Sequence, residues 1–537
     1  MTMLSFDAQH FPYPSRRNVV YARNGMVATS QPLAAQAGLQ VLQTGGNAID
    51  AAIAAAAALS VLEPSANGIG GDAFALIWHE GRLHGLNASG PAGAASTRES
   101  LTRLGLTAMP KYGPLSVTVP GTPAAWAALA ERFGRLPLTR SMAAAIGYAR
   151  NGFPVSPSVA YAWQQAARIF RTELREPHFR HWFETFATTR PPEAGEVWRS
   201  AGHADTLQSI AETGAASFYS GALAEKIAGF MQSTGGQLTL ADLAGYRVDW
   251  VAPISVGYRG FDVWEIPPNG HGLVALIALN LLKGFDFSER DSVLTHHRQI
   301  EAIKLAFADG LAHIADPAHM RVSVADLLSD AYATERRKLI AETAALPSPG
   351  IPPSGGTVYL STADAEGNMV SMIQSNYMGF GSGMVVPGTG ISLHNRGHNF
   401  SLAADHPNCI APGKRPYHTI IPGFLTRNGA AVGPFGVMGG FMQPQGHVQM
   451  VMNTVDFHLN PQAALDAPRW EWESARTVHI EHTTGEHLFR GLAARGHDVN
   501  WQNNRLSFGR GQIIWRDASG TLCGGTEPRT DGAVVGW

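Results

Sequence analysis

The sequence predicts a globular fold of the mixed α/β (α+β) class, because helical and strand patterns are interspersed along the chain. An alanine-rich run from 48 to 62 is apolar on nearly every side, which predicts a helix enclosed between other layers. The segments 357–362 and 369–375 are rich in β-branched and apolar residues and flank a turn, which predicts a β-hairpin. The chain has 537 residues, 45% of them hydrophobic, so a large core can form around these elements.

The other elements follow from similar patterns. Asn47 is placed to cap the 48–62 helix, and Pro64 is placed to end it. A second hairpin is expected at 72–87, with its turn at Glu80-Gly81. Further helices are expected at 122–133, 139–151, 221–234, 296–315 and 443–457, and strands at 254–266 and 430–437, while the pattern is weaker from 163 to 206.

Composition excludes several classes of protein. With 40 basic and 42 acidic residues, the charge gives no basis for nucleic acid or an anionic membrane as the main partner. No uncharged apolar run reaches 18 residues, and the N-terminal segment lacks the pattern of a secretory signal, so we expect a cytoplasmic protein without membrane spans. Cys409 and Cys523 are too few for a disulfide scaffold or a cysteine-rich metal module. One disulfide stays possible, although two reduced thiols fit the cytoplasm better.

The most informative local feature lies between 346 and 357. Residues 346–356 are dominated by Pro, Ser and Gly, so they can form neither a helix nor a central strand, and an exposed, flexible linker is expected. Thr357 follows directly at the first position of a core strand. It is either simply a β-branched residue that begins the strand, or an N-terminal nucleophile that is exposed when the Gly356–Thr357 bond cleaves itself.

In the second interpretation, the Thr357 hydroxyl attacks the preceding carbonyl and an N→O shift gives an ester that water cleaves. The freed α-amine then acts as the base for the same hydroxyl. Gly356 suits this junction, because glycine tolerates unusual backbone angles and leaves room for the attack.

The hairpin adds a neighbour for this hydroxyl. If Glu366-Gly367 forms a two-residue turn, Thr357 lies opposite Asn376 and beside Ser375, within about 5 Å between Cβ atoms. A longer turn would shift this pairing by one residue. Either way, a hydroxyl or an amide is available to orient the Thr357 oxygen.

A Gly439-Gly440 step precedes the 443–457 helix. Backbone N–H groups at such a step can point at a developing oxyanion, although glycine pairs often only turn the chain. His178 and His181, with Glu176 and Glu184 nearby, could suggest a metal, but their segment is amphipathic and rich in arginine. His297 and Glu301 have an i,i+4 spacing but no third ligand nearby, so no metal site is expected.

Many spaced blocks of this sequence occur together in the γ-glutamyltransferase family of Ntn hydrolases, and the chain resembles that family from 26 to 536. The blocks are Gly45-Gly46-Asn47-Ala48-Ile49-Asp50-Ala51-Ala52, Gly68-Ile69-Gly70-Gly71-Asp72, Pro120-Gly121-Thr122, Phe218-Tyr219-Ser220-Gly221, Asp242-Leu243, Glu301-Ala302-Ile303-Lys304-Leu305-Ala306, Asp316-Pro317, Thr357, Asp364-x-x-Gly367-Asn368, Phe380-Gly381-Ser382-Gly383, Gly413-Lys414-Arg415-Pro416 and Gly439-Gly440.

This resemblance implies a four-layer αββα sandwich that needs no cofactor and no metal. It implies cleavage between Gly356 and Thr357 into a large subunit, 1–356, and a small subunit, 357–537, which together form one fold. Thr357 matches the nucleophile, and Ser375 matches the hydroxyl residue that hydrogen-bonds to it. Gly439 and Gly440 match the oxyanion hole.

The positions that would read a γ-glutamyl group match the family poorly. The arginine that holds the glutamate α-carboxylate is replaced by Asn87, and an acidic residue by Asn399. Other family positions are occupied by Tyr377, His418 and Thr419. A zwitterionic α-amino acid would therefore lose both of its charge partners, which typically costs several kcal/mol.

This sequence offers Asn395-Arg396 instead. Arg396 is either a structural residue or a fork that grips a substrate carboxylate with two hydrogen bonds. The sequences around Thr357 and Gly440 are similar to a branch with oxamate amidohydrolases and acylase-like proteins. An amidohydrolase acting on a small carboxylate-bearing amide is therefore favoured, with the two subunits of one precursor as partners, in a complex that could dimerise. A glutathione hydrolase with a rearranged site and an unprocessed, non-catalytic relative remain as alternatives.

Overall fold

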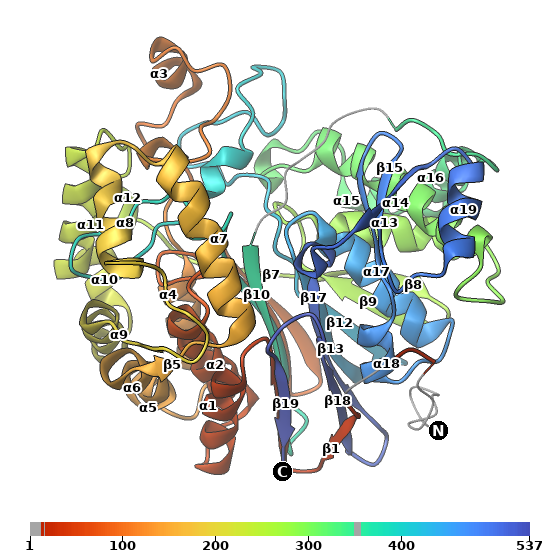
Figure 1. The fold of residues 1–537 in the computed structure, drawn as a ribbon, viewed down its shortest axis with the longest axis horizontal. Coiled ribbons are helices and arrows are strands. Elements are labelled where there is room, and N and C mark those ends of the chain that lie inside the picture. The colour runs from red at the N-terminus through yellow and green to blue at the C-terminus, as the bar shows by residue number, and fades with distance from the viewer. Residues whose placement is uncertain (1–11, 15–16, 348–355) are drawn as a thin grey trace.

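The computed structural model describes residues 12–14, 17–347 and 356–537. Two seven-stranded sheets pack face to face in its centre (Figure 1). In spatial order, one sheet holds β19 (Ala533–Gly536), β2 (Gly25–Thr29), β10 (Gly356–Asp364), β11 (Met369–Tyr377), β3 (Asp72–His79), β4 (Arg82–Ala88) and β7 (Asp249–Val251). The other holds β1 (Val20–Ala22), β18 (Leu522–Thr526), β17 (Arg510–Arg516), β13 (Ala430–Met438), β12 (Gly423–Arg427), β9 (Phe261–Glu265) and β8 (Ile254–Tyr258).

Helices cover the outer face of each sheet. On the first sheet lie α1 (Pro32–Gln43), α2 (Ala48–Leu62) and α4 (Thr122–Phe133), with further helices outside them. On the second lie α13 (Gly272–Leu282), α17 (Met442–Val455) and α18 (Pro461–Asp466), with α14 (Val293–His313) packed against α13. The contacts of β10 with β13 and β17 close the interior between the sheets. The αββα order implied by the family resemblance is therefore confirmed.

The remaining elements lie at the periphery. They are α3 (Arg98–Arg103), α5 (Leu138–Ser141), α6 (Ala143–Asn151), α7 (Pro157–Glu173), α8 (Arg180–Phe186), α9 (Ala201–Thr213), α10 (Ala216–Ser220), α11 (Ala222–Ser233), α12 (Leu240–Ala244), α15 (Val324–Leu327), α16 (Asp330–Arg337), α19 (Glu486–Ala494), a three-stranded sheet of β14 (Trp470–Ser474), β15 (Thr477–Glu481) and β16 (Asp498–Gln502), and the pair β5 (Phe153–Pro154) and β6 (Val197–Trp198). The segment with the weaker pattern, 163–206, contains most of α7 and all of α8. In α7 a regular buried stripe includes Trp163, Ala166, Ala167 and Phe170, and polar residues occupy the opposite side.

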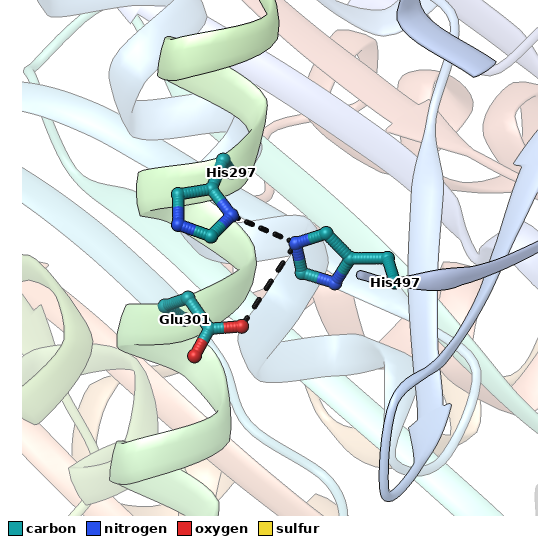
Figure 2. Close-up of side chains that lie close together, drawn as sticks. All are labelled: His297, Glu301 and His497. Atoms are coloured by element: carbon teal, nitrogen blue, oxygen red, sulfur yellow. Dashed lines mark hydrogen bonds and ion pairs between the residues drawn. The ribbon is translucent and has the colours of Figure 1, made fainter. Parts of the chain in front are cut away.

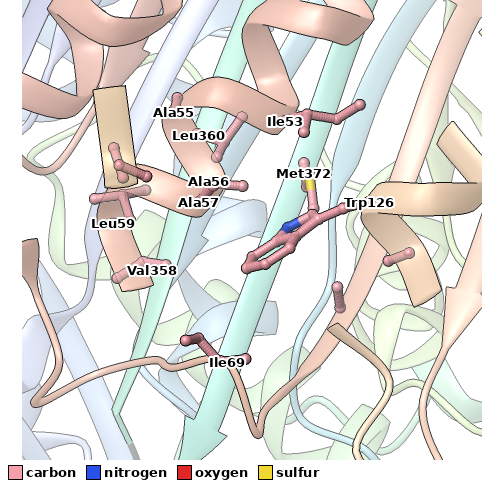
Figure 3. Close-up of a cluster of buried hydrophobic side chains, with 14 of the residues drawn as sticks. Ile53, Ala55, Ala56, Ala57, Leu59, Ile69, Trp126, Val358, Leu360 and Met372 are labelled. Carbon is pink, nitrogen blue, oxygen red and sulfur yellow. The ribbon is translucent and has the colours of Figure 1, made fainter. Parts of the chain in front are cut away.

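Helix α2 is the clearest case of local sequence setting the fold. The Asn47 side chain accepts hydrogen bonds from the N–H groups of Ile49 and Asp50, which caps the helix as predicted. Every residue of α2 is buried. Figure 3 shows this helix and Trp126 packed against Val358, Leu360 and Met372 of the β10–β11 hairpin. Small alanine side chains let α2 pack closely against the sheet. This packing holds β10, the strand that contains Thr357, in place.

The structure also bears on the cysteines, on membrane spans and on the linker that the sequence analysis considered. Cys409 and Cys523 are both free thiols, so the possible disulfide is not formed. Within the described ranges, no helix is both long and apolar enough to cross a membrane. The predicted linker falls mostly on 348–355, which lie outside the described residues.

Candidate active site

Thr357 is the second residue of the central strand β10, and a bulge at this position interrupts the pairing with β11. Its side chain is buried, and its Oγ donates a hydrogen bond to Ser375 Oγ over 3.2 Å. A β-bulge re-aims one side chain relative to the regular ladder. The predicted meeting of Thr357 and Ser375 is thus present in the structure.

The register differs by one residue from the two-residue turn that we considered first. Val358 pairs with Gln374 and Ala363 pairs with Met369, so the connection between β10 and β11 is longer. The Asp364 carboxylate accepts hydrogen bonds from the N–H groups of Glu366 and Asn368, which stabilises this longer turn. The shift brings Ser375, rather than Asn376, next to Thr357.

Ser375 is held in turn by the backbone of Tyr377. The Tyr377 N–H donates to Ser375 Oγ over 2.7 Å, and Tyr377 adopts a left-handed φ of 76°. A non-glycine residue in this region is strained, and such strain concentrates at functional sites. The turn directs the Tyr377 ring towards Arg396, whose guanidinium carbon lies 4.3 Å from the ring centre.

Gly439 and Gly440 follow the end of β13 and precede α17, with φ values of 135° and 60°. Both values lie in the region that favours glycine. Their carbonyl groups accept hydrogen bonds from the N–H groups at the start of α17. Among the described residues, neither glycine N–H has a hydrogen-bond acceptor, so both donors are available to an oxyanion.

Gln443, in the first turn of α17, is a neighbour of Thr357 that sequence reasoning missed. Its Nε2 lies 3.5 Å from Thr357 Oγ, and its Oε1 accepts a hydrogen bond from the Ile421 N–H. The residue stands in the same motif as Gly439 and Gly440, but only the packing of α17 against the sheet end brings it to Thr357. It links the nucleophile to the 418–421 segment.

Arg396 is fully buried, although a guanidinium is costly to remove from water. Its Nη1 donates to Thr419 Oγ1 over 2.6 Å, while Nε and Nη2 have no hydrogen-bond partner within the described ranges. Burial lowers the pKa of Arg396 to about 10, against the opposing charge of Asp72. Two N–H donors of this buried cation are therefore unused among the described residues.

Asp72 supplies the countercharge for this region and was not predicted as a site residue. It begins β3, lies opposite Ser375 in the pairing with β11, and is fully buried. His418 Nε2 lies 2.9 Å from one of its carboxylate oxygens, and His394 Nε2 lies 3.5 Å from the other. Burial raises the pKa of Asp72 to about 7, although the Arg396 charge opposes this shift.

The two histidines connect Asp72 to the Arg396 loop. Burial holds the pKa of both imidazoles well below the ordinary value, so both are neutral. His394 Nδ1 accepts the Arg396 backbone N–H, while its Nε2 has no hydrogen-bond partner in the described part of the chain. His418 Nε2 hydrogen-bonds to Asp72, and His418 directly precedes Thr419, the partner of the Arg396 side chain. Asp72 is therefore linked by a hydrogen bond to the segment that holds the Arg396 side chain.

The other predicted substrate-binding residues have mainly structural contacts. Asn395 accepts the Met378 N–H and donates to the Lys111 carbonyl, which joins three segments near Arg396. Asn87 is engaged with Ser89 and Asn269. Its amide belongs to this network and is not paired with Arg396.

A group of His297, Glu301 and His497 is the one set in the described part of the chain whose ligand atoms lie close enough to hold a metal ion (Figure 2). Sequence reasoning found the first two and missed His497, which is 200 positions away. His297 Nδ1 and His497 Nε2 are 2.8 Å apart, and His297 Nε2 contacts the Ala341 carbonyl. Lys304 already pairs with Glu301 over 2.6 Å. These contacts join the group into a hydrogen-bonded cluster, although His497 Nδ1 has no partner in the described part of the chain. Among the described residues, His178 and His181 belong to no such group.

A four-layer αββα sandwich with a hydroxyl residue at the head of a central strand defines the class of N-terminal-nucleophile hydrolases. The sequence profile of the gamma-glutamyltranspeptidase family matches residues 34–537. This chain therefore belongs to that family of Ntn hydrolases, and it is an enzyme of the amidase or peptidase type.

Three relatives illustrate the breadth of the family. The oxamate amidohydrolase proenzyme of Klebsiella pneumoniae is 37% identical, with 96% of this chain and 98% of that protein covered. The glutathione hydrolase-like YwrD proenzyme of Bacillus subtilis is 35% identical, covering 95% and 98%. The crystal structure of a cephalosporin acylase from Bacillus halodurans is 61% identical, with a TM-score of 0.95 and 99% of each chain covered.

Proposed function

We propose that this protein is an autoprocessed N-terminal-threonine amidohydrolase whose substrates are small amides with a carboxylate in the acyl group, oxamate being the first to test. The observation that carries this proposal is the buried Arg396 with two unused N–H donors. Guanidinium and carboxylate groups match each other through two parallel hydrogen bonds.

Maturation is proposed at the Gly356–Thr357 bond. The Thr357 Oγ attacks the Gly356 carbonyl carbon, the C–N bond breaks, and the acyl group moves from nitrogen to oxygen. Water then hydrolyses this ester, which leaves a carboxylate on Gly356 and an α-amine on Thr357. The bulge at Thr357 and the Ser375 hydrogen bond support this step, because both orient the attacking oxygen. The proenzyme names of two relatives agree with it.

Turnover would use the same atoms. The α-amine of Thr357 accepts the hydroxyl proton while Oγ attacks the amide carbonyl of the substrate. The N–H groups of Gly439 and Gly440 receive the oxyanion, and the amine leaves with the proton. Water then attacks the acyl-threonine ester, which releases the acid and restores the free hydroxyl.

A series of contacts links Arg396 to Thr357. The Arg396 side chain contacts Thr419, and two residues later the Ile421 N–H is bound by Gln443, which contacts Thr357. These contacts support the proposal that a carboxylate held by Arg396 presents a nearby amide carbonyl to the nucleophile. Asn87 and Asn399, in place of charged family residues, leave no matching pair for a glutamate zwitterion.

The test is a panel of simple amides on the matured enzyme, with oxamate, malonamate, succinamate and a γ-glutamyl anilide as substrates. The Arg396→Lys variant keeps the charge but loses the planar fork, so KM for the best substrate should rise about tenfold or more while self-cleavage continues. The neutral diamide of the best acid serves as the control and should be affected less. An unchanged KM would remove Arg396 from the site. Equal turnover of glutathione and the best small amide would instead favour a glutathione hydrolase with a rearranged site.

A further inference from the structure

We propose that a pocket beside Gly439 binds the leaving amine of the substrate, and that it selects amines with a flat apolar body and an anionic group. This inference rests on the proposed amidohydrolase function and names the second half of its substrate. The pocket has a volume of about 290 Å³, and Lys111, Tyr112, Phe170, Met378, Gly439 and Arg510 are among its lining residues.

The pocket adjoins the proposed reaction centre through two of its lining residues. Gly439 carries one of the N–H donors proposed to receive the oxyanion, and Met378 directly follows Tyr377. The Asn395 side chain accepts the Met378 N–H and donates to the Lys111 carbonyl over 2.8 Å. The wall that carries Lys111 is therefore fastened to the residue next to Arg396, so the pocket and the proposed carboxylate site share one support.

The pocket wall combines aromatic surface with positive charge. Tyr112 meets Phe170 edge to face, with 5.4 Å between ring centres, and Ile169 adds apolar surface from the same helix. The Lys111 ammonium lies 4.9 Å from the Tyr112 ring centre and has no carboxylate partner in the described part of the chain. Arg510 pairs with Glu63 over 3.2 Å, but its Nε has no partner there.

Glu63 already pairs with Arg510, and Glu173 lies near Tyr112, but neither carboxylate lines the pocket. Lys111 is therefore the lining cation left without a carboxylate partner in the described part of the chain. A ligand in the pocket would meet this ammonium and an aromatic surface. A flat ring fits the apolar wall, and a carboxylate or sulfonate fits Lys111.

The amine side of the substrate is the part that can reach this pocket. In the proposed complex, Arg396 holds the carboxylate of the acyl group, and Gly439 and Gly440 bind its carbonyl oxygen, so both ends of the acyl group are fixed. The only other part of the amide is the substituent on its nitrogen. We therefore place this substituent in the pocket that Gly439 lines.

The experiment compares two oxamates that differ only in their amine, N-phenyloxamate and N-(4-carboxyphenyl)oxamate, on the matured enzyme. We expect kcat/KM about two- to fivefold higher for the carboxyphenyl compound, because Lys111 is exposed and one exposed charge contact contributes up to about 1 kcal/mol. Lys111→Met should bring this ratio close to one, and Ile169→Glu should lower it as well, because Ile169 is 44% exposed and lines the pocket. Lys226→Met, on the exposed side of α11, is the matched control and should keep the wild-type ratio.

The outcomes separate the two proposals. If both oxamates are hydrolysed but the wild-type ratio is one, or if it survives Lys111→Met, the pocket assignment is overturned and the amidohydrolase function stands. If no oxamate is hydrolysed, the proposed substrate class fails, and calorimetric titration with 4-aminobenzoate and with aniline tests the pocket directly. The pocket is supported if 4-aminobenzoate binds more tightly than aniline and if Lys111→Met weakens the binding of 4-aminobenzoate. Equal binding of the two amines overturns the pocket assignment.

Discussion

Thr357 and Ser375 show how backbone geometry can prepare a nucleophile. The bulge at Thr357 turns its hydroxyl to Ser375, and the left-handed Tyr377 directs its N–H at the same Ser375 oxygen. The serine oxygen therefore receives two donors from different strand positions. Such an arrangement leaves the Thr357 oxygen oriented by few contacts, which suits the proposed nucleophile, since it would react once in maturation and again in turnover.

Thr357→Ala should remain a single chain, because no side-chain oxygen is left to attack the Gly356 carbonyl. Thr357→Ser should still be cleaved, more slowly, since its hydroxyl lacks the methyl group that restricts rotation. Denaturing electrophoresis and N-terminal sequencing measure both results. A small fragment that begins anywhere but Thr357 would refute the assignment of the nucleophile.

Gly440→Ala should lower kcat by roughly 10²–10³, the usual effect of losing one oxyanion donor. The residue has a φ of 60°, which an alanine adopts only with strain, so the loop should relax and turn the N–H away. The measurement is kcat on the best small amide, with the extent of self-cleavage as a check on folding. Full activity in a cleaved Gly440→Ala enzyme would place the oxyanion donors elsewhere.

Asp72 should make stability depend on pH. Its pKa is raised from 3.8 to about 7 by burial, so the folded state binds a proton that the unfolded chain has released. Its contribution to the free energy of unfolding is therefore full below about pH 4 and is lost as pH rises through about 7. Asp72→Asn cannot ionise. The melting temperature of Asp72→Asn minus that of wild type should increase as pH rises from about 5 to about 8.

The matched control is Asp205→Asn, at an exposed site on α9, whose melting temperature should follow wild type at every pH. A difference between Asp72→Asn and wild type that stays constant with pH would contradict the raised pKa.

At the scale of elements, α14 fastens the last described segment before the proposed cleavage site. Glu301 pairs with Lys304 in the buried interior, and their free groups bind the Ala345 backbone, Glu301 to its N–H and Lys304 to its carbonyl. His497 stays neutral beside them, because burial lowers its pKa to about 3. The cluster therefore joins His497, which would belong to the proposed small subunit, to both α14 and the 341–345 segment.

Removing one member of the buried Glu301–Lys304 pair should destabilise the folded state. Glu301→Ala leaves the Lys304 ammonium buried without a countercharge, which we expect to lower the free energy of unfolding by about 3–5 kcal/mol. The double variant Glu301→Ala/Lys304→Met should recover part of that loss, because no buried charge remains. Denaturant titration of both variants measures this. An equal loss in the single and double variants would show that packing, and not charge, is responsible.

At the scale of the whole molecule, the proposed cleavage divides the chain but not the fold. Strand β10 would belong to the small subunit, yet it pairs with β2 of the large one, and β11 pairs with β3 of the large one. Strand β19 also pairs with β2 from the other side. Each sheet thus contains strands from both subunits, so neither subunit has a complete core alone.

Cleavage should therefore produce two fragments that stay together. Sharing the 57.3 kDa in proportion to residue number gives fragments of roughly 38 and 19 kDa. They should co-elute on size exclusion in native buffer, separate on a denaturing gel, and unfold in one cooperative transition. Two separate unfolding transitions in the matured enzyme would show that the subunits are independent domains.

Sequence alone determined the local parts of this protein. The Asn47 cap, the 72–87 hairpin and the alanine helix follow from short-range patterns, and the structure has all three. The Thr357–Ser375 contact was also within reach, because one hairpin joins them. The two-residue turn considered first gives a register one residue away from that observed between Val358 and Ala363, whereas the longer turn, the other possibility, gives the observed pairing. The Asp364 side chain stabilises the longer turn, and strand propensities do not predict the turn length.

Tertiary structure alone decided how the distant residues meet. Gln443 contacts Thr357, Asp72 lies close to His394 and His418, and Lys111 and Gly439 line one pocket, although each pair is far apart in sequence. Helical and strand periodicities arise from the backbone within a few residues, so they can be read locally. Which side chains share a buried site depends instead on how whole layers pack. From the sequence, Arg396 could be either a structural residue or a contact for a substrate carboxylate. Its complete burial with two unused N–H donors favours the second role, and only the tertiary structure reveals that burial.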